Sequence, residues 1–357
     1  MDNVFSNKMT ILKALAIILV VSGHLEFSFF PMFPPYSFQL ALFFFISGML
    51  FKEKYIYDIK TYFLRRLKSL MLPYFGYEIA YIIITLIIYK LSGNFLASPI
   101  TLKNFFITPF LNGHQLLLCA PLWFVPQLFI SLIAFVVLMR ILVNFKTKYK
   151  TLFFLLLGFA SIPFIKIMGN TPLILLLMRT MFSLCFIYFG YFYIKEIKDK
   201  INIFSTNIFL AILIIQAFLW LFNRDFTPEH GIGLSYVLVW GRFDNQLIVP
   251  ILTAFSGIWF SLFFVNITYS YLKDIKFIQD IGKTTYHIMA NHLFVMFLIT
   301  NILCKITNHH IDFSNSDNIY TIYDPIQTTF VYFILVIVIC VYFAKFQQFI
   351  YKKIFKK

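Results

Sequence analysis

Two ionisable residues in the first apolar stretch of the chain have a spacing that could support proton chemistry. Lys13 and His24 are eleven residues apart, so in an α-helix they lie within about 20° of one face and about 16 Å apart along the axis. Ionisable groups inside a membrane span are costly unless they face a cavity or a partner. A neutral imidazole at position 24 can accept the proton of a hydroxyl group. The alternative is a packing role, in which His24 bonds a backbone carbonyl.

Two later apolar stretches also contain polar residues. Arg179 is expected about two turns inside its helix, where an arginine pairs with a carboxylate or lines an aqueous path; Glu78 is one candidate partner. His287 and Asn291 are four residues apart and share one helix face, whereas His292 points about 140° away from His287. We therefore expect no metal site from the two histidines. The alternative for these groups is a structural role, bridging helices within the membrane.

A basic cluster, Arg65-Arg66-Leu67-Lys68, precedes the third apolar stretch. Basic residues beside a span are usual on the cytoplasmic side of a membrane protein, and that is one interpretation of the cluster. The other is an anion site, because guanidinium groups bind phosphate with two parallel hydrogen bonds. Composition does not choose between the two.

Composition identifies the class of protein. The chain has 357 residues, of which 60% are hydrophobic and only 13% charged, and its mean hydropathy is +0.82. Soluble domains are about 45–50% apolar and about 25% charged, so a soluble globular protein and a disordered chain are both excluded. The net charge of +15 then indicates basic loops beside anionic lipid rather than a surface that binds nucleic acid.

Ten apolar runs of about 16–22 residues are long enough to approach or cross a hydrocarbon core of about 30 Å. The pattern predicts an all-α polytopic membrane protein of about ten transmembrane helices, formed by one domain over residues 1–357 with no appended soluble domain. The predicted spans lie near 11–30, 36–51, 71–91, 122–143, 151–168, 173–194, 203–222, 246–265, 283–303 and 326–344.

The distribution of basic residues predicts the orientation of these spans. If the N-terminus is cytoplasmic, 23 of the 30 lysines and arginines fall on or beside cytoplasmic segments, as the positive-inside rule requires. Both termini are therefore predicted to be cytoplasmic. Three longer segments, about 92–121, 223–245 and 304–325, are expected on the outer side.

The four cysteines do not indicate a metal or redox site. Cys119, Cys185, Cys304 and Cys340 form no Cys-x-x-Cys pair and no Cys/His spacing typical of zinc ligands. A disulfide between Cys119 and Cys304 stays open. No cysteine sits in an evidently electropositive segment, where a reactive thiolate would be expected.

Taken in order, six segments resemble the acyltransferase-3 family of integral membrane acyltransferases. The first resembles the family's basic residue, ten residues and histidine of the first span, and the others follow its later motifs. The segments are Lys13 to His24, Leu42 to Leu50 (LFFFISGML), Arg65 to Tyr74 (RRLKSLMLPY), Pro121 to Val125 (PLWFV), Arg179 with Phe189-Gly190-Tyr191, and Gly282 to Thr285 (GKTT) ahead of Ile288 to His292 (IMANH).

The resemblance implies O-acyl transfer in a membrane. The donor would be acyl-CoA, most often acetyl-CoA, bound from the cytoplasm, and the acceptor would be a hydroxyl of an exported or lipid-linked glycan. His24 is then the expected general base. The CoA phosphates would be held by Lys13, Arg65, Arg66 and Lys68. The substrate path would be lined by Trp123, Arg179, Asn291 and His292. No metal is expected.

The chain departs from the family pattern at two places. The basic residue of the first span is typically arginine, and here Lys13 can supply a point charge but not a planar fork. In the late segment Tyr286 lies six residues before His292 rather than two or three, and His287 is additional. The sequence therefore leaves open which of the two histidines matters.

Two other functions fit the same ten-span pattern. A proton-coupled carrier of a small solute or glycan intermediate would also contain buried arginine and histidine, although no inverted repeat is visible. A non-catalytic membrane protein of glycan assembly is the other. The acceptor, acetyl against succinyl transfer, direct transfer against an acyl-enzyme, and the oligomeric state stay open. The expected location is the bacterial plasma membrane.

Overall fold

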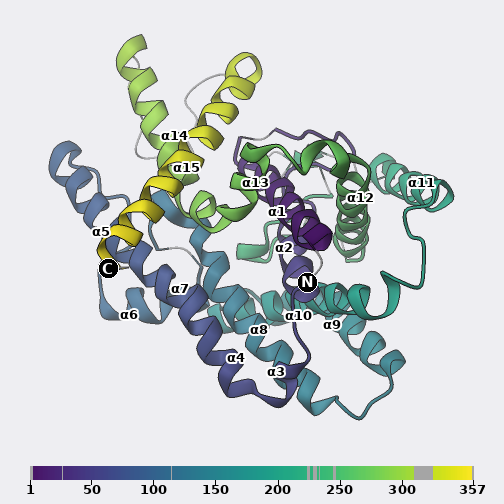
Figure 1. Ribbon diagram of the computed structural model, residues 1–357. Coiled ribbons are helices and arrows are strands. Elements are labelled where there is room, and N and C mark those ends of the chain that lie inside the picture. Colours follow the sequence, from purple (N-terminus) through teal and green to yellow (C-terminus); the bar gives the residue numbers. More distant parts are fainter. Residues whose placement is uncertain are drawn as a thin grey trace.

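The computed structural model describes residues 3–25, 27–113, 115–222, 226–227, 231–232, 234–243, 247–308 and 325–355 (Figure 1). Helices dominate this part of the chain, and the two strands are two residues each, paired antiparallel. The chain is thus all-α, as the apolar pattern predicted, because within lipid a helix satisfies its own backbone hydrogen bonds.

The helical elements before the strands are α1 (Asn3–Gly23), α2 (Gln39–Met49), α3 (Lys54–Tyr57), α4 (Ile59–Arg66), the π-helical turn η1 (Leu67–Met71), α5 (Leu72–Ser92), α6 (Leu102–Phe106), α7 (Thr108–Leu111), the 3-10 turn η2 (Leu117–Trp123), α8 (Phe124–Ile141), α9 (Thr147–Met168), α10 (Pro172–Phe192), the π-helical turn η3 (Tyr193–Ile197) and α11 (Thr206–Phe222). The strands are β1 (Phe226–Thr227) and β2 (Gly231–Ile232), followed by the 3-10 turn η4 (Leu238–Trp240), α12 (Val249–Leu272), α13 (Lys276–Lys283), α14 (Thr285–Thr307) and α15 (Pro325–Phe355).

A helix stands at each of the ten predicted spans. Among the described residues, eight helical stretches are long and apolar enough to cross a membrane, and two apolar helices, Gln39–Met49 and Thr206–Leu221, are shorter. The prediction of a polytopic membrane protein is confirmed. The cytoplasmic position of the termini stays a prediction.

Three predicted spans had wrong boundaries. The first helix spans Asn3–Gly23 rather than about 11–30, and Lys8 on its first turns donates to Asn266 of α12 at 2.8 Å. The second helix has only 11 residues, about 16 Å, which is too short to cross the hydrocarbon core. The third begins at residue 59, since α4, η1 and α5 form one continuous stretch, Ile59–Ser92. The basic cluster therefore lies on a helix and not in a loop.

Two glycines allow α2 and α10 to touch backbone to backbone. A Cβ atom on Gly48 would overlap the carbonyl oxygen of Ile187, and a Cβ on Gly190 would overlap the carbonyl oxygen of Phe45. Small residues at such crossings let helices approach closely in a membrane, where packing rather than the hydrophobic effect drives association. This contact fixes α2 against the helix that carries Arg179.

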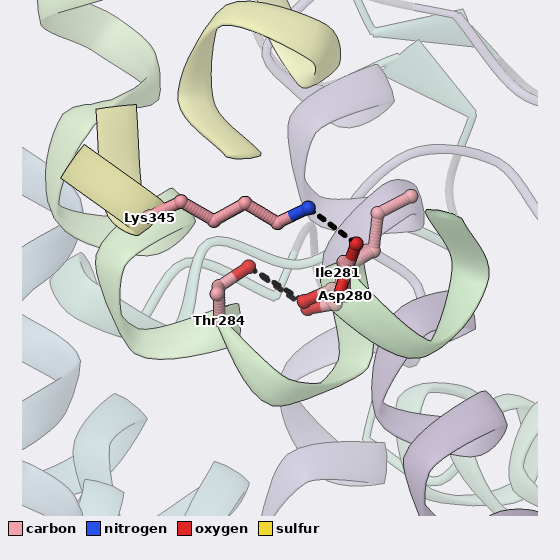
Figure 2. Close-up of polar contacts among 4 residues, drawn as sticks. All are labelled: Asp280, Ile281, Thr284 and Lys345. Atoms are coloured by element: carbon pink, nitrogen blue, oxygen red, sulfur yellow. Dashed lines mark hydrogen bonds and ion pairs between the residues drawn. The ribbon is translucent and has the colours of Figure 1, made fainter. Parts of the chain in front are cut away.

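The short helix α13 joins α1 to α14 and α15. Gly282 of α13 packs against the backbone of Thr10 on α1, so closely that a side chain would overlap it. Figure 2 shows that Asp280 of α13 pairs with Lys345 of α15 at 2.5 Å, while Thr284 donates to the Asp280 carbonyl at 2.8 Å. These contacts set the relative position of the two helices that carry His24 and His292.

Segments predicted to share the cytoplasmic side of the membrane do meet one another. Lys195 pairs with Glu53 at 2.6 Å, and the cations of Arg140 and Lys198 lie over the rings of Tyr57 and Phe5 at 5.2 and 4.6 Å. Burial alone would raise the pKa of Glu53, but hydrogen bonds from Lys195 and Tyr191 outweigh it and hold that pKa below its usual value. The grouping of inner segments on one side of the fold is what the positive-inside pattern requires.

Segments between the predicted spans meet one another and the start of the second predicted span, and we call residues 34–37, 94–113, 115–119 and 234–243 the loop layer. The backbone N–H of Tyr236 donates to the Tyr36 carbonyl at 3.1 Å, and the Ser235 hydroxyl donates to the Pro35 carbonyl at 2.6 Å. The side chain of Val239 lies so close to Gly113 that a Cβ there would meet it at 2.7 Å.

Parts of the loop layer contact the longest helices well before the ends of those helices. Phe105 stacks on Phe75 of α5 at 5.4 Å, and Phe75 is seventeen residues, about 25 Å, before the end of that helix. His292 of α14, which contacts His24 beside the layer, is fifteen residues, about 22 Å, before Thr307. In Figure 1 the ends of α5, α14 and α15 project beyond the other helices.

The projecting ends carry exposed apolar side chains, which places them in lipid rather than in water. Leu298, Ile302 and Ile306 of α14 are 42%, 58% and 73% exposed, and Leu91 near the end of α5 is 81% exposed. Contiguous apolar surface of this kind is not stable in water but is the normal lipid-facing surface of a membrane helix. The position of segments 92–121 and 223–245 relative to the membrane surface stays a prediction.

We expect Gly190→Ala to destabilise the protein strongly, because the new methyl group must push α10 away from α2. Overpacking of this kind costs about 1–3 kcal/mol or more, and the thermal unfolding temperature in detergent should fall. Gly76→Ala is the matched control, since nothing lies within 4 Å of the added Cβ and alanine favours a helix. Equal unfolding temperatures for the two variants would contradict the backbone contact.

We expect a nitroxide attached at Leu298→Cys to collide more with oxygen than with a water-soluble nickel complex in lipid nanodiscs. Power-saturation EPR measures this ratio, and the same label at Lys60→Cys, an exposed position on α4, should give the reverse. Nickel-dominated collisions at position 298 would show that α14 projects into water and that the loop layer lies at the membrane surface.

Candidate active site

Two histidines from α1 and α14 meet at the edge of the loop layer. His24 is the first residue after α1, with its N–H still donating to the Val20 carbonyl at 3.3 Å. Its ring lies 5.0 Å from the ring of His292, centroid to centroid, at an angle of 49°. His292 is fully buried. The structure thus brings together two imidazoles that are separated by 268 positions in the chain.

The protonation pattern of neutral His292 follows from the partner of its Nδ1 atom. Its Nδ1 lies 2.9 Å from the Ile288 carbonyl oxygen, and because a carbonyl only accepts, Nδ1 must carry the hydrogen. The Nε2 atom then has a free lone pair. That atom is buried and has no hydrogen-bond partner in the described structure, so it can accept a hydrogen bond from a substrate.

The His24 ring also contacts Tyr36. The Tyr36 hydroxyl lies 3.3 Å from His24 Nδ1, and the two rings meet edge to face with centroids 5.8 Å apart. Since Nδ1 faces the tyrosine, Nε2 is the atom of His24 that can exchange a proton with a reacting group.

A second cluster, of positively charged side chains, lies about eleven residues before His24 on α1. Lys13 is partly buried and close enough to Arg66 of α4 for the two positive charges to repel each other. The Arg66 guanidinium lies over the ring of Tyr62 at 4.9 Å, and its Nε–H is buried without a hydrogen-bond partner in the described structure. Two cations and an unpaired donor at one place are suited to an anion such as a phosphate.

The other two basic residues of the predicted cluster are placed differently. Arg65 is exposed, and its guanidinium donates to the Tyr55 hydroxyl at 2.9 Å. Lys68 is exposed on η1. Of the three basic residues, Arg66 is the one close enough to Lys13 for their charges to repel, because neighbouring residues on a helix point about 100° apart.

Arg179 and Trp123 form a third group next to the loop layer. The guanidinium of Arg179 is almost fully buried and lies 5.6 Å from the centre of the Trp123 ring, a cation–π geometry. It also donates to the carbonyl of Leu111 and, at 3.2 Å, to that of Leu175. The suggested partner Glu78 was wrong: Glu78 accepts from Tyr74 at 2.8 Å, and no ion pair joins these two described residues.

Asn291 belongs to a polar network that links α5, α14 and α15. Its side chain accepts from Tyr81 at 2.9 Å and donates to the Tyr77 hydroxyl at 3.3 Å, while Tyr77 also lies 2.6 Å from His287 Nδ1 and donates to Gln347 at 2.8 Å. His287 and Asn291 do share a face, as their spacing predicted. This network faces α5, whereas His292 faces His24.

The sequence model of the acyltransferase-3 family, described as an acyltransferase domain, matches residues 7–345. The chain belongs to this family. No curated protein and no solved structure matches the chain. It is therefore a multi-pass membrane acyltransferase, and the family match favours this function over the carrier alternative.

The acyltransferase contains functional candidates that the sequence did not reveal. Three tyrosines contact these candidates from other parts of the chain: Tyr36 contacts His24, Tyr77 contacts His287 and Tyr81 contacts Asn291. The chain has 21 tyrosines, and the sequence spacing of a tyrosine does not predict which histidine it contacts on another helix. Only the packing of the helices identifies these residues.

The cysteines of the acyltransferase are not placed for nucleophilic chemistry. All four are free and buried, so the disulfide that was left open between Cys119 and Cys304 does not form. No group of three or more histidine, cysteine or acidic side chains among the described residues could hold a metal ion.

We expect Lys13→Met to raise the thermal unfolding temperature of the acyltransferase by about 1–3 °C in low-salt buffer without ligand, because it removes one of two like charges in a partly buried place. Lys68→Met, at an exposed position, is the control and should change it little. Added salt should narrow the difference between wild type and Lys13→Met, since it screens the repulsion. A lower unfolding temperature for Lys13→Met would show that Lys13 has a stabilising partner instead.

Proposed function

We propose that this acyltransferase moves an acyl group, in the simplest case acetyl, from cytoplasmic acyl-CoA to a hydroxyl of an exported or lipid-linked glycan. The observation that carries the proposal is the His24–His292 pair, in which the Nε2 atom of His292 is buried and has no hydrogen-bond partner in the described structure. Transfer from a thioester to a hydroxyl requires a base at the hydroxyl and a polar group to orient it, and a neutral imidazole pair provides both.

The cation cluster supports CoA as the donor. Lys13 and Arg66 repel each other, and a phosphate group between them would relieve the repulsion and accept from the buried Arg66 Nε–H. Arg65 and Lys68, which are exposed beside them, would add charge at the periphery. Lys13 and His24 are about 16 Å apart along α1, a separation that the extended pantetheine arm of CoA would bridge between phosphates and thioester.

The acyl donor supplies an activated carbonyl carbon; the residues of this chain handle the proton. Nε2 of His24 accepts the proton of the attacking hydroxyl as its oxygen forms the new bond to the acyl carbon. The carbon–sulfur bond then breaks, and His24 returns the proton to the departing thiolate, so that no net proton is consumed. His292 Nε2 accepts a hydrogen bond from the substrate and holds it beside His24. Direct transfer fits this arrangement because the cysteines are buried.

The recessed position of the histidines supports an acceptor that approaches from the outer side or from the bilayer. His292, whose ring is close to that of His24, lies about 22 Å before the end of α14, beside the loop layer. Arg179, Trp123 and Asn291 would line the path around it. A glycan attached to a membrane lipid, in a bacterial plasma membrane, meets these conditions.

We expect deletion of the acyltransferase to remove O-acyl groups from the surface glycan of its host, and wild type but not His24→Ala to restore them. Mass spectrometry of the glycan measures the acylation, at membrane abundances matched by immunoblot. A loss of about 10²-fold or more is expected, as for removal of a general base.

Two further variants separate the histidines. His292→Gln should also fail to restore acylation, while His287→Gln, whose imidazole faces Tyr77, should retain most of it. Unchanged acylation in the deletion strain would reject the glycan acceptor. Full activity of His24→Ala would reject the proposed base.

A further inference from the structure

An apolar groove lies where α1, α13 and α15 meet. The residues that line it include Ile18 of α1, Phe277, Ile278 and Ile281 of α13, and Ile334 and Ile337 of α15, and no polar residue is among its lining. The groove holds about 390 Å³ of unfilled space, its open side included. Small-molecule sites are of about this size, but they also contain a few polar groups. A groove without any polar group is suited to a hydrocarbon chain.

The groove lies at the depth of the hydrocarbon core. Both α1 and the stretch Thr329–Phe349 of α15 are apolar and long enough to cross a membrane. Ile337 is eight residues, about 12 Å, from the start of that stretch and twelve residues, about 18 Å, from its end. Ile334 is 43% exposed, so the groove opens to the surrounding lipid. An unfilled groove at this depth forfeits the dispersion contacts that a chain inside it would make.

The helix α13 has two unlike faces. Its residues Phe277, Ile278 and Ile281 line the groove, whereas Lys276 and Lys283, which are seven residues apart, project from the opposite side. Both lysines are exposed, and no ion pair joins either of them to another described residue. A helix with an apolar face and a basic face lies at the boundary between hydrocarbon and headgroups. The lysines therefore lie at the depth of the headgroups, close in sequence to residues that line the groove.

The acidic residues near these lysines are already paired. Asp280, the acidic residue of α13, pairs with Lys345 of α15 at 2.5 Å, and Figure 2 shows this pair beside Ile281. Before the helix, the side chains of Lys273 and Asp274 lie 4.0 Å apart. The positive charge of the two exposed lysines is therefore left without a balancing carboxylate among the described residues. Such a surface attracts anionic headgroups, as basic segments beside a membrane do.

We propose that the groove binds an acyl chain of an anionic phospholipid, whose phosphate lies at Lys276 and Lys283. The chain fills the space between α1 and α15, and the headgroup bonds to the helix that joins them. The lipid belongs to the leaflet on the side of α13, which is the predicted cytoplasmic side. Zwitterionic phospholipids offer the same chains without a net charge, so the lysines give the site its preference. The site is separate from the histidine pair, and its occupancy does not depend on the proposed acyl transfer.

Native mass spectrometry of the purified full-length protein measures the first lipid bound, with phosphatidylglycerol and phosphatidylcholine of identical acyl chains as probes. Wild type should bind phosphatidylglycerol at least about fivefold more tightly than phosphatidylcholine. Ile334→Trp, which places an indole at the open side of the groove, should weaken the binding of both lipids about 10-fold, because the chain loses apolar contact. Ile302→Trp, at an exposed apolar position of α14, is the control and should leave both affinities unchanged.

A second pair of variants tests the charge. The double variant Lys276→Gln/Lys283→Gln should remove the preference for phosphatidylglycerol while it keeps the binding of phosphatidylcholine. Both positions are exposed, so the fold should not be disturbed. Lys60→Gln/Lys148→Gln, at exposed lysines of α4 and α9, makes the same change in net charge and should keep the preference.

Several results would overturn the proposal. Equal affinity of wild type for the two lipids, or an unchanged preference in Lys276→Gln/Lys283→Gln, would reject the headgroup site, and unchanged lipid binding in Ile334→Trp would reject the groove. A polyprenyl phosphate that displaces phosphatidylglycerol at equal concentration would assign the groove to the tail of a lipid-linked acceptor instead. A dimer that Ile334→Trp dissociates would assign it to a second copy of this chain. Lipid binding is measured without acyl donor or acceptor, so its failure is distinct from a loss of acylation in His24→Ala.

Discussion

Direct contact between helix backbones is the constraint on which the rest of the structure depends. Gly48 and Gly190 let α2 lie against α10, and Gly282 lets α13 lie against α1. A methyl group at any of these positions would overlap a carbonyl, so the helices would have to separate by more than the short contacts of the site can tolerate. The His24–His292 contact and the proximity of Lys13 to Arg66 follow from these crossings, because they join helices rather than neighbours in sequence.

The charged and polar groups within the membrane are stabilised mainly by neutral partners. Arg179 donates to two backbone carbonyls and contacts an aromatic face, and His292 donates to the carbonyl of the preceding turn. Such partners satisfy a donor without adding a fixed negative charge near the site. For the proposed CoA donor this arrangement is favourable, since carboxylates close to the cation cluster would compete with its phosphates.

Several features were predicted from the sequence for reasons that are local. Ten apolar runs gave ten helices, and the i, i+4 spacing of His287 and Asn291 placed them on one face, because hydrophobicity and helical periodicity act along the chain. The second helix was predicted too long, and the third was predicted to begin only after the basic cluster. Both errors arise where tertiary packing, rather than hydropathy, decides where a helix begins or ends. The suggested partner of Arg179 was also wrong, since the carbonyls that Arg179 contacts belong to α7 and to its own helix.

The sequence by itself determined the class, the family and the identity of the residues able to do chemistry. Composition requires a membrane, and the order of the motifs carries the resemblance that the family match confirmed. Only the tertiary structure decided which histidine faces His24 and which arginine lies near Lys13. The physical reason is that hydropathy and periodicity describe one helix at a time, whereas the distance between two side chains on different helices depends on where the helices cross and how closely their backbones can approach.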